Sequence, residues 1–167
     1  IREEIETSYK LTLQKALEEI EILKGNADKK TVYAHRKFVE PMLDYIVKDF
    51  ESSRIINGNN GIGGMVVCDS SEQAKMMHNI FQDNYDNASD ESGNIAEESY
   101  NSRQKQLSKV KSAAVILYDV GTKKEREDQI EDFKDGKIDL LFVYNMLLTG
   151  FDSSRLKKLY IGRVIKS

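Results

Sequence analysis

The sequence predicts an α/β fold in which a parallel β-sheet is flanked by helices and preceded by a helical arm. Four short apolar runs in the second part of the chain are continuous rather than alternating, which is typical of strands buried on both faces. Segments with helix-start signals separate these runs, and this order favours a parallel sheet with right-handed crossovers. The first third of the chain instead repeats apolar residues at helical spacing.

Residues 1–57 are predicted to form this helical arm, or linker. The apolar residues of its first helix are Ile5, Tyr9, Leu13, Ala16, Ile20 and Leu23, and Gly25 with Asn26 ends that helix. The apolar stripe of its second helix is Phe38, Val39, Met42, Leu43, Ile46, Val47 and Phe50. Pro41 lies inside this stripe, where a proline either kinks a helix or belongs to its first turn.

Residues 58–167 are predicted to form the sheet domain, with strands at 65–68, 113–118, 140–144 and 159–161. Two helices between the strands begin with capping boxes, Ser70 with Gln73 and Thr122 with Glu125. The glycine-rich run 58–64 precedes the first strand and lacks the Lys-Ser/Thr of a phosphate-binding loop, so we interpret it as a flexible linker.

An acidic segment interrupts the sheet domain. Residues 86–98 contain five acids, no base and a single large aliphatic residue, Ile95. Such a segment buries too little apolar area to offset the entropy of ordering it. We expect a mobile insertion at about 86–105.

The composition excludes several classes of protein. The 167 residues carry a net charge of −3 and one cysteine, which excludes an internal disulfide and a cysteine-based zinc site. The two histidines have no metal-site spacing, and no apolar run is long enough to span a membrane. These features favour a cytoplasmic protein without a metal or membrane site. Residues 153–167 are rich in bases without an acid, and they either follow phosphates or protect a strand edge.

The candidate site residues follow the predicted strands, because ligands of open α/β sheets bind at the carboxyl ends of the strands. After the third strand, Thr149 offers a hydroxyl to a phosphate, Gly150 permits close backbone approach, and Asp152 accepts from a sugar hydroxyl or binds a cation. Ser70 and Ser71 open a helix after the first strand, where backbone N–H groups and the helix dipole favour an anion.

These segments resemble a known family. The run 140–160, with its Met-Leu-Leu-Thr-Gly-Phe-Asp sequence, resembles motif V of superfamily 2 helicases in the form found in the motor, or R, subunit of type I restriction enzymes. The run 64–74 resembles motif IV, and residues 114–118 with the helix that ends near Gly136 resemble the stretch between these motifs. The family usually has Asp where this chain has Asn145, so the charge at that position is lost.

The resemblance implies the second RecA-like lobe of an ATP-dependent double-stranded DNA translocase. Ser70 and Ser71 of motif IV and Thr149 of motif V would contact the DNA backbone, and Gly150 and Asp152 would face the nucleotide. ATP and Mg²⁺ would be held mostly by the other lobe. The expected partners are DNA and the methylation and specificity subunits of the restriction complex. The resemblance assigns no catalytic residue to this chain, so the isolated chain is expected to be inactive although the parent enzyme hydrolyses ATP and cuts DNA.

Three other functions remain open from the sequence. A phospho-receiver-like domain would use Asp69 and Asp119 at strand ends, although the acidic insertion fits it poorly. A mononucleotide-binding regulatory domain would require a glycine fingerprint after the first strand, where Asp69, Ser70 and Ser71 stand instead. An interaction module would dock a partner on the amphipathic arm.

Overall fold

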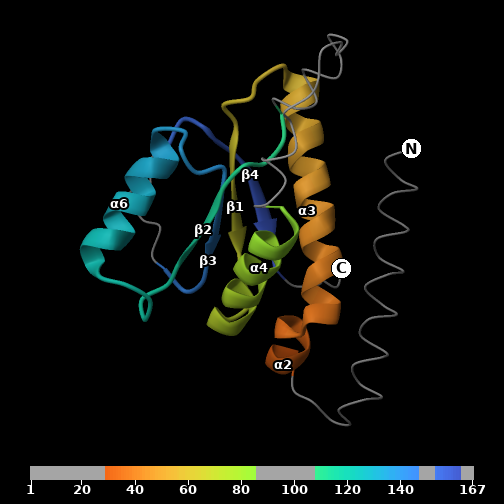
Figure 1. Cartoon of the computed structure of the whole chain (residues 1–167), viewed down its shortest axis with the longest axis vertical. Coiled ribbons are helices and arrows are strands. Elements are labelled where there is room, and N and C mark those ends of the chain that lie inside the picture. Colours follow the sequence, from red (N-terminus) through yellow and green to blue (C-terminus); the bar gives the residue numbers. More distant parts are fainter. Residues whose placement is uncertain (1–28, 86–107, 147–152, 163–167) are drawn as a thin grey trace.

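The computed structural model describes residues 29–85, 108–146 and 153–162. Figure 1 shows the helices and strands of this part of the chain. The helices are α2 (Lys29–Ala34), α3 (Arg36–Asn57), α4 (Ser71–Asn84) and α6 (Lys123–Lys134). The strands are β1 (Gly63–Val67), β2 (Ala113–Ile116), β3 (Leu140–Val143) and β4 (Leu156–Ile161).

The four described strands form one sheet in the order β2-β3-β1-β4, and every neighbouring pair is parallel. This arrangement confirms the predicted parallel α/β sheet. The sheet order also bears on the alternatives. In both common doubly wound orders β1 lies beside β2, whereas here β1 lies between β3 and β4. The order of the described strands therefore differs from the flavodoxin-like order that receiver domains have.

The helices cover the sheet on both faces, as Figure 1 shows. On one face, α3 and α4 bury their apolar sides in a core that includes Val66, Leu140 and Phe142 of the sheet. On the other face, Phe133 of α6 packs with side chains from β1, β2 and β3. Three layers therefore result, and β1 and β3 at the centre are buried along almost their whole length.

Helices α2 and α3 are the described helices of the predicted arm, and α3 packs directly on the sheet. Its buried side is the apolar stripe predicted from the sequence. His35 caps its start by accepting a hydrogen bond from the backbone N–H of Lys37, at 3.1 Å. Pro41 lies in the second turn, and the helix continues past it to Asn57. Gly58, with φ of 58°, ends the helix, as is typical of a glycine at this position.

The flexible-linker interpretation of residues 58–64 is wrong at its carboxyl end. Gly63 and Gly64 belong to β1 and are buried. A Cβ atom on Gly64 would lie 2.8 Å from Leu140 Cδ2 and 3.0 Å from two ring atoms of Phe50. Glycine suits this position because the side chains of Phe50 on α3 and Leu140 on β3 occupy the space of a Cβ, so a larger residue would have to displace them.

The two predicted capping boxes have different outcomes. Thr122 forms the complete box, accepting from the N–H of Glu125 at 3.1 Å while its own N–H donates to Glu125 Oε2 at 3.2 Å. Ser70 Oγ accepts from the N–H of Gln73 at 3.0 Å, but Gln73 Oε1 accepts from Asp69 instead of Ser70. The second box is thus only half confirmed.

Strand β4 departs from the prediction of strands covered on both faces. It begins at Leu156 rather than 159 and lies at the edge of the sheet. Its side chains alternate in exposure, and Leu159 and Ile161 are 63% and 45% exposed. The predicted first helix of the arm and the predicted insertion at 86–105 lie outside the described residues.

Candidate functional site

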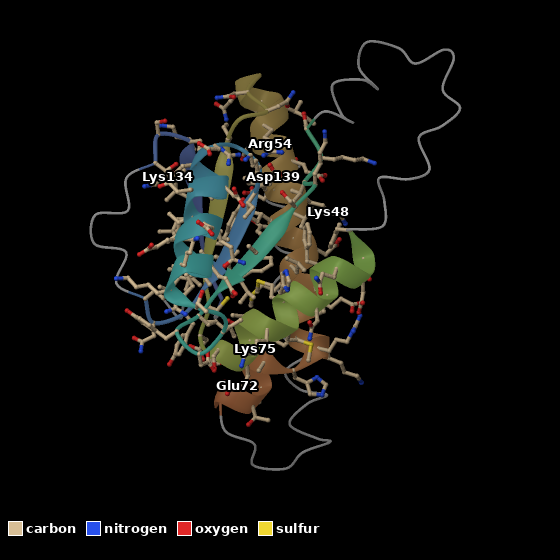
Figure 2. The ribbon with its side chains drawn as sticks, turned by 60° about the vertical axis from the view of Figure 1, so that its left-hand side comes forward. Lys48, Arg54, Glu72, Lys75, Lys134 and Asp139 are labelled. Atoms are coloured by element: carbon tan, nitrogen blue, oxygen red, sulfur yellow. The ribbon has the colours of Figure 1, made fainter. Side chains whose placement is uncertain are left out.

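The candidate site lies at the carboxyl edge of the sheet, where the parallel strands end at the same level. Val67, the last residue of β1, pairs with Val143 of β3 and with Ile161 of β4. In Figure 2, Glu72 and Lys75 of α4 mark this end of the molecule, and Arg54 and Asp139 mark the opposite end. The segments that leave β1 and β3 toward the predicted site therefore start from adjacent strands.

The turn between β1 and α4 holds Ser70 and Ser71. Ser70 is the N-cap of α4 and is buried, and its hydroxyl accepts from the N–H of Gln73. Ser71 is the first residue of the helix and is partly exposed. The first N–H groups of a helix have no acceptor within the helix, so this end attracts anions. Of the two serines, Ser71 has the more accessible side chain.

The segment after β3 begins with an uncommon backbone conformation. Asn145 is exposed and has φ of 50°, the only positive φ among the described residues other than glycine. The chain thus turns sharply at the carboxyl edge directly after β3. Thr149, Gly150 and Asp152 lie outside the described residues, so their placement remains a prediction.

The loop after β2 is held by an arginine that the sequence analysis did not single out. Arg126 Nη1 donates to the carbonyl oxygens of Tyr118, Val120 and Gly121 at 3.1 to 3.3 Å. Asp119, one of the carboxylates of the receiver alternative, lies 3.4 Å from Lys75 of α4. Arg126 lies among other charged residues of α6 and belongs to no motif, so its contacts with this loop could not be predicted from the sequence.

Cys68 directly follows β1 at the carboxyl edge of the sheet, and it is buried. Burial raises the pKa of its thiol to about 12, and its backbone N–H donates to the carbonyl of Val143 at 2.7 Å. The thiol therefore stays protonated and unreactive near neutral pH.

Two bases of the predicted basic tail are engaged in internal contacts. Arg155 donates to the carbonyls of Phe133, Ile138 and Gly61, and burial lowers the pKa of its guanidinium. Lys158 Nζ lies 2.9 Å from a carboxylate oxygen of Asp49 on α3. These two side chains fasten β4 to its neighbours, whereas Lys157 is exposed.

A buried ion pair at the opposite edge was also missed. Arg54 is 2% exposed, and its Nη2 lies 2.7 Å from Asp139 Oδ1. The same guanidinium donates twice to the carbonyl of Ile62, and the backbone N–H of Lys111 donates to Asp139 Oδ2. The pair joins α3 to the starts of β1, β2 and β3.

Two kinds of feature are absent from the described residues 29–85, 108–146 and 153–162. None of their helices is long and apolar enough to cross a membrane. In the same ranges, no group of three or more His, Cys, Asp or Glu side chains could hold a metal ion.

Comparison with protein families identifies the chain. The family model for type I restriction enzyme subunit R domain 3 matches residues 65–167, which is more than half of the sequence. The chain belongs to this family. The matched region begins at Met65 within β1 and contains β3, and it includes all five candidate site residues, Ser70, Ser71, Thr149, Gly150 and Asp152.

A solved structure supports the fold of this R-subunit domain. The crystal structure of the Hef helicase domain of Pyrococcus furiosus superimposes with a TM-score of 0.51 at 11% sequence identity, covering 92% of this chain. The fold is therefore the RecA-like α/β arrangement of a helicase domain, as the sequence predicted. The R-subunit chain spans 29% of that structure's length. A comparison with curated proteins gives no match.

Proposed function

We propose that this chain is part of the second RecA-like lobe of the ATP-dependent double-stranded DNA translocase of a type I restriction enzyme. The match to domain 3 of the R subunit carries this proposal. In the intact enzyme the lobe would work with the methylation and specificity subunits. Its task would be to hold the DNA backbone and to close over the nucleotide, while the other lobe supplies most of the nucleotide-binding residues.

The geometry of the carboxyl edge supports a DNA contact there. The turn that carries Ser70 and Ser71 leaves β1, and the segment toward Thr149 leaves the adjacent β3. Hydroxyl groups near the ends of two adjacent strands would suit a phosphate backbone, because hydroxyl and backbone N–H donors contact phosphates without selecting a base sequence. Ser70 would contribute through the helix end that it caps, and Ser71 and Thr149 would contribute through their hydroxyls.

The nucleotide contact rests on Gly150 and Asp152. Gly150 would let the backbone approach ATP closely, and Asp152 would accept a hydrogen bond from a sugar hydroxyl or face the cation. The sequence has no phosphate-binding loop of its own. ATP and Mg²⁺ would accordingly bind between the lobes, with most of their ligands on the other lobe.

The test uses the intact R subunit with Ser71→Ala, Thr149→Ala and Asp152→Ala. Loss of a hydroxyl–phosphate hydrogen bond should weaken DNA binding by about 1.5 to 3 kcal/mol, because the acceptor is charged. Asp152→Ala should lower the rate of ATP-driven translocation. All three variants should keep the wild-type melting temperature to within a few degrees.

Ser112→Ala is the matched control. Ser112 lies before β2 at the opposite edge of the sheet, where its hydroxyl donates to the carbonyl of Lys137 at 2.8 Å. This variant should leave DNA binding unchanged. Wild-type translocation in the three site variants, or an equal loss in the control, would contradict the proposal.

A further inference from the structure

The side chain of Gln73 is completely buried and uses both ends of its amide. Its Oε1 accepts from the backbone N–H of Asp69 at 2.7 Å. Its Nε2 donates to the carbonyl of Tyr33 at 2.9 Å and also to the carbonyl of Gly162. A primary amide has two N–H donors, so both donors are in use.

The three partners of Gln73 belong to three separate segments of the chain. Asp69 is in the turn between β1 and α4, Tyr33 is in α2, and Gly162 directly follows β4. Each partner is a backbone group, so the contacts fix the course of the main chain. One side chain therefore joins the helical arm, the candidate DNA-contacting turn and the end of the edge strand.

Gly162 is adapted to this contact. A Cβ atom at this position would collide with Gln73 Oε1 and would lie 3.1 Å from Cα of Cys68. Glycine thus allows the chain leaving β4 to approach both α4 and the end of β1. An aliphatic residue at position 73 would fill the space but would leave one N–H and two carbonyls without their present partner, which is costly for buried groups.

We propose that Gln73 is a positioning residue for DNA binding, which holds the turn carrying Ser70 and Ser71 in register with α2 and with the end of β4. This inference rests on the proposed DNA contact at that turn. Gln73 itself is buried and touches no DNA. Its effect passes through the N–H of Asp69 and through the helix start, whose orientation determines where Ser71 points.

The experiment compares Gln73→Glu and Gln73→Met in the intact R subunit. Gln73→Glu keeps an acceptor for Asp69 but places a second oxygen against two carbonyls, whereas Gln73→Met keeps the length and loses every hydrogen bond. We measure the DNA concentration that gives half-maximal stimulation of ATP hydrolysis, together with the rate at saturating DNA. Both variants should raise that concentration about tenfold, equivalent to about 1.4 kcal/mol, and leave the saturating rate within about twofold.

Ile80→Val is the matched control. Ile80 is a buried residue of the same helix that packs in the core away from the turn. This variant should lower the melting temperature without changing the DNA concentration required. An unchanged DNA requirement in both Gln73 variants, or failure of both to fold, would overturn the inference. If Ser71→Ala and Thr149→Ala also leave DNA binding unchanged, the proposed function itself fails. If Ser71→Ala and Thr149→Ala weaken DNA binding while both Gln73 variants bind DNA like wild type, only the role of Gln73 is overturned.

Discussion

The pair of Arg54 and Asp139 illustrates how a single carboxylate supports several chain segments. Its two oxygens accept from the guanidinium of Arg54 and from the backbone N–H of Lys111. Arg54 is also within 4.5 Å of the centre of the Phe50 ring. Burial of both charges is costly, so the pair adds little net stability, but removing one partner would leave the other charge buried and uncompensated.

Asp139→Ala should therefore destabilise the protein by about 3 to 5 kcal/mol, because it leaves the Arg54 charge buried without its partner. Urea unfolding at neutral pH measures this loss. Asp135→Ala, at an exposed position near the end of α6, is the control and should change stability by at most about 0.5 kcal/mol. A loss below about 1 kcal/mol in Asp139→Ala would show that the pair is dispensable.

Tyr160 gives a prediction about alkaline pH. Its hydroxyl donates to a carboxylate oxygen of Asp49 at 2.7 Å. Burial, and then the hydrogen bond to Asp49, raise the pKa of this phenol above its ordinary value. Burial and Asp44 raise the pKa of Tyr85 in the same way. The folded state therefore keeps these protons at a pH at which the unfolded chain releases them.

The sign of the pH dependence follows from this difference. The stabilisation is fully present below the unfolded tyrosine pKa of about 10 and should be lost as the pH rises above it. Urea unfolding between pH 8 and pH 11 should show a falling free energy of unfolding, with a shallower fall in Tyr160→Phe. Tyr118→Phe, which changes a tyrosine that is 61% exposed, is the control. Equal slopes in wild type and Tyr160→Phe would contradict the prediction.

At the scale of elements, the stability of α6 depends strongly on the capping of its ends, because its apolar face is small. Phe133 is its only residue that is buried, so packing contributes less than in α3. The capping box at Thr122 satisfies backbone groups at its start. Thr122→Ala should cost about 0.5 to 2 kcal/mol in urea unfolding. Lys124→Ala in the same turn keeps the cap and should be nearly neutral, and an equal loss in both variants would rule out the cap as the cause.

Elements were predictable where one local pattern determined them. The apolar stripe of α3, the central strands β1 and β3, and the cap of α6 agree with the sequence because burial or capping follows from a few neighbouring residues. The start of β4 was missed because Lys157 and Lys158 interrupt its apolar pattern. The amide of Gln73 escaped notice because its partners at positions 33 and 162 are far away in sequence.

At the scale of the whole molecule, the fold followed from the order of elements. The candidate site followed from the position of its residues after predicted strands, and the resemblance added their roles toward DNA and nucleotide. The parallel sheet could be predicted from strands separated by helices. The position of β1 between β3 and β4 could not, because a helical crossover can connect a strand either to its neighbour in the sheet or to a strand further away. Ser70 and Ser71 are placed by the fold, whereas Thr149, Gly150 and Asp152 remain predictions.

The purified 167-residue chain should not hydrolyse ATP, because its sequence lacks the glycine-rich loop with Lys and Ser/Thr that grips a triphosphate. Phosphate release with and without double-stranded DNA measures this. The control is the intact R subunit under the same conditions, which should be active. DNA-stimulated phosphate release by the chain alone, reduced by Thr149→Ala with Asp152→Ala, would contradict the prediction.

The left-handed backbone at Asn145 limits which residues evolution can place after β3. Asn and Asp adopt positive φ more readily than other side chains, because their short polar groups form local hydrogen bonds, whereas a β-branched residue would be strained by about 1 to 2 kcal/mol. Asn145 can therefore replace the aspartate usual in the family without changing the turn. Such an exchange removes a negative charge directly after β3, at the edge that we propose to contact the nucleotide and the DNA, and Asn145 still adopts the left-handed conformation found there.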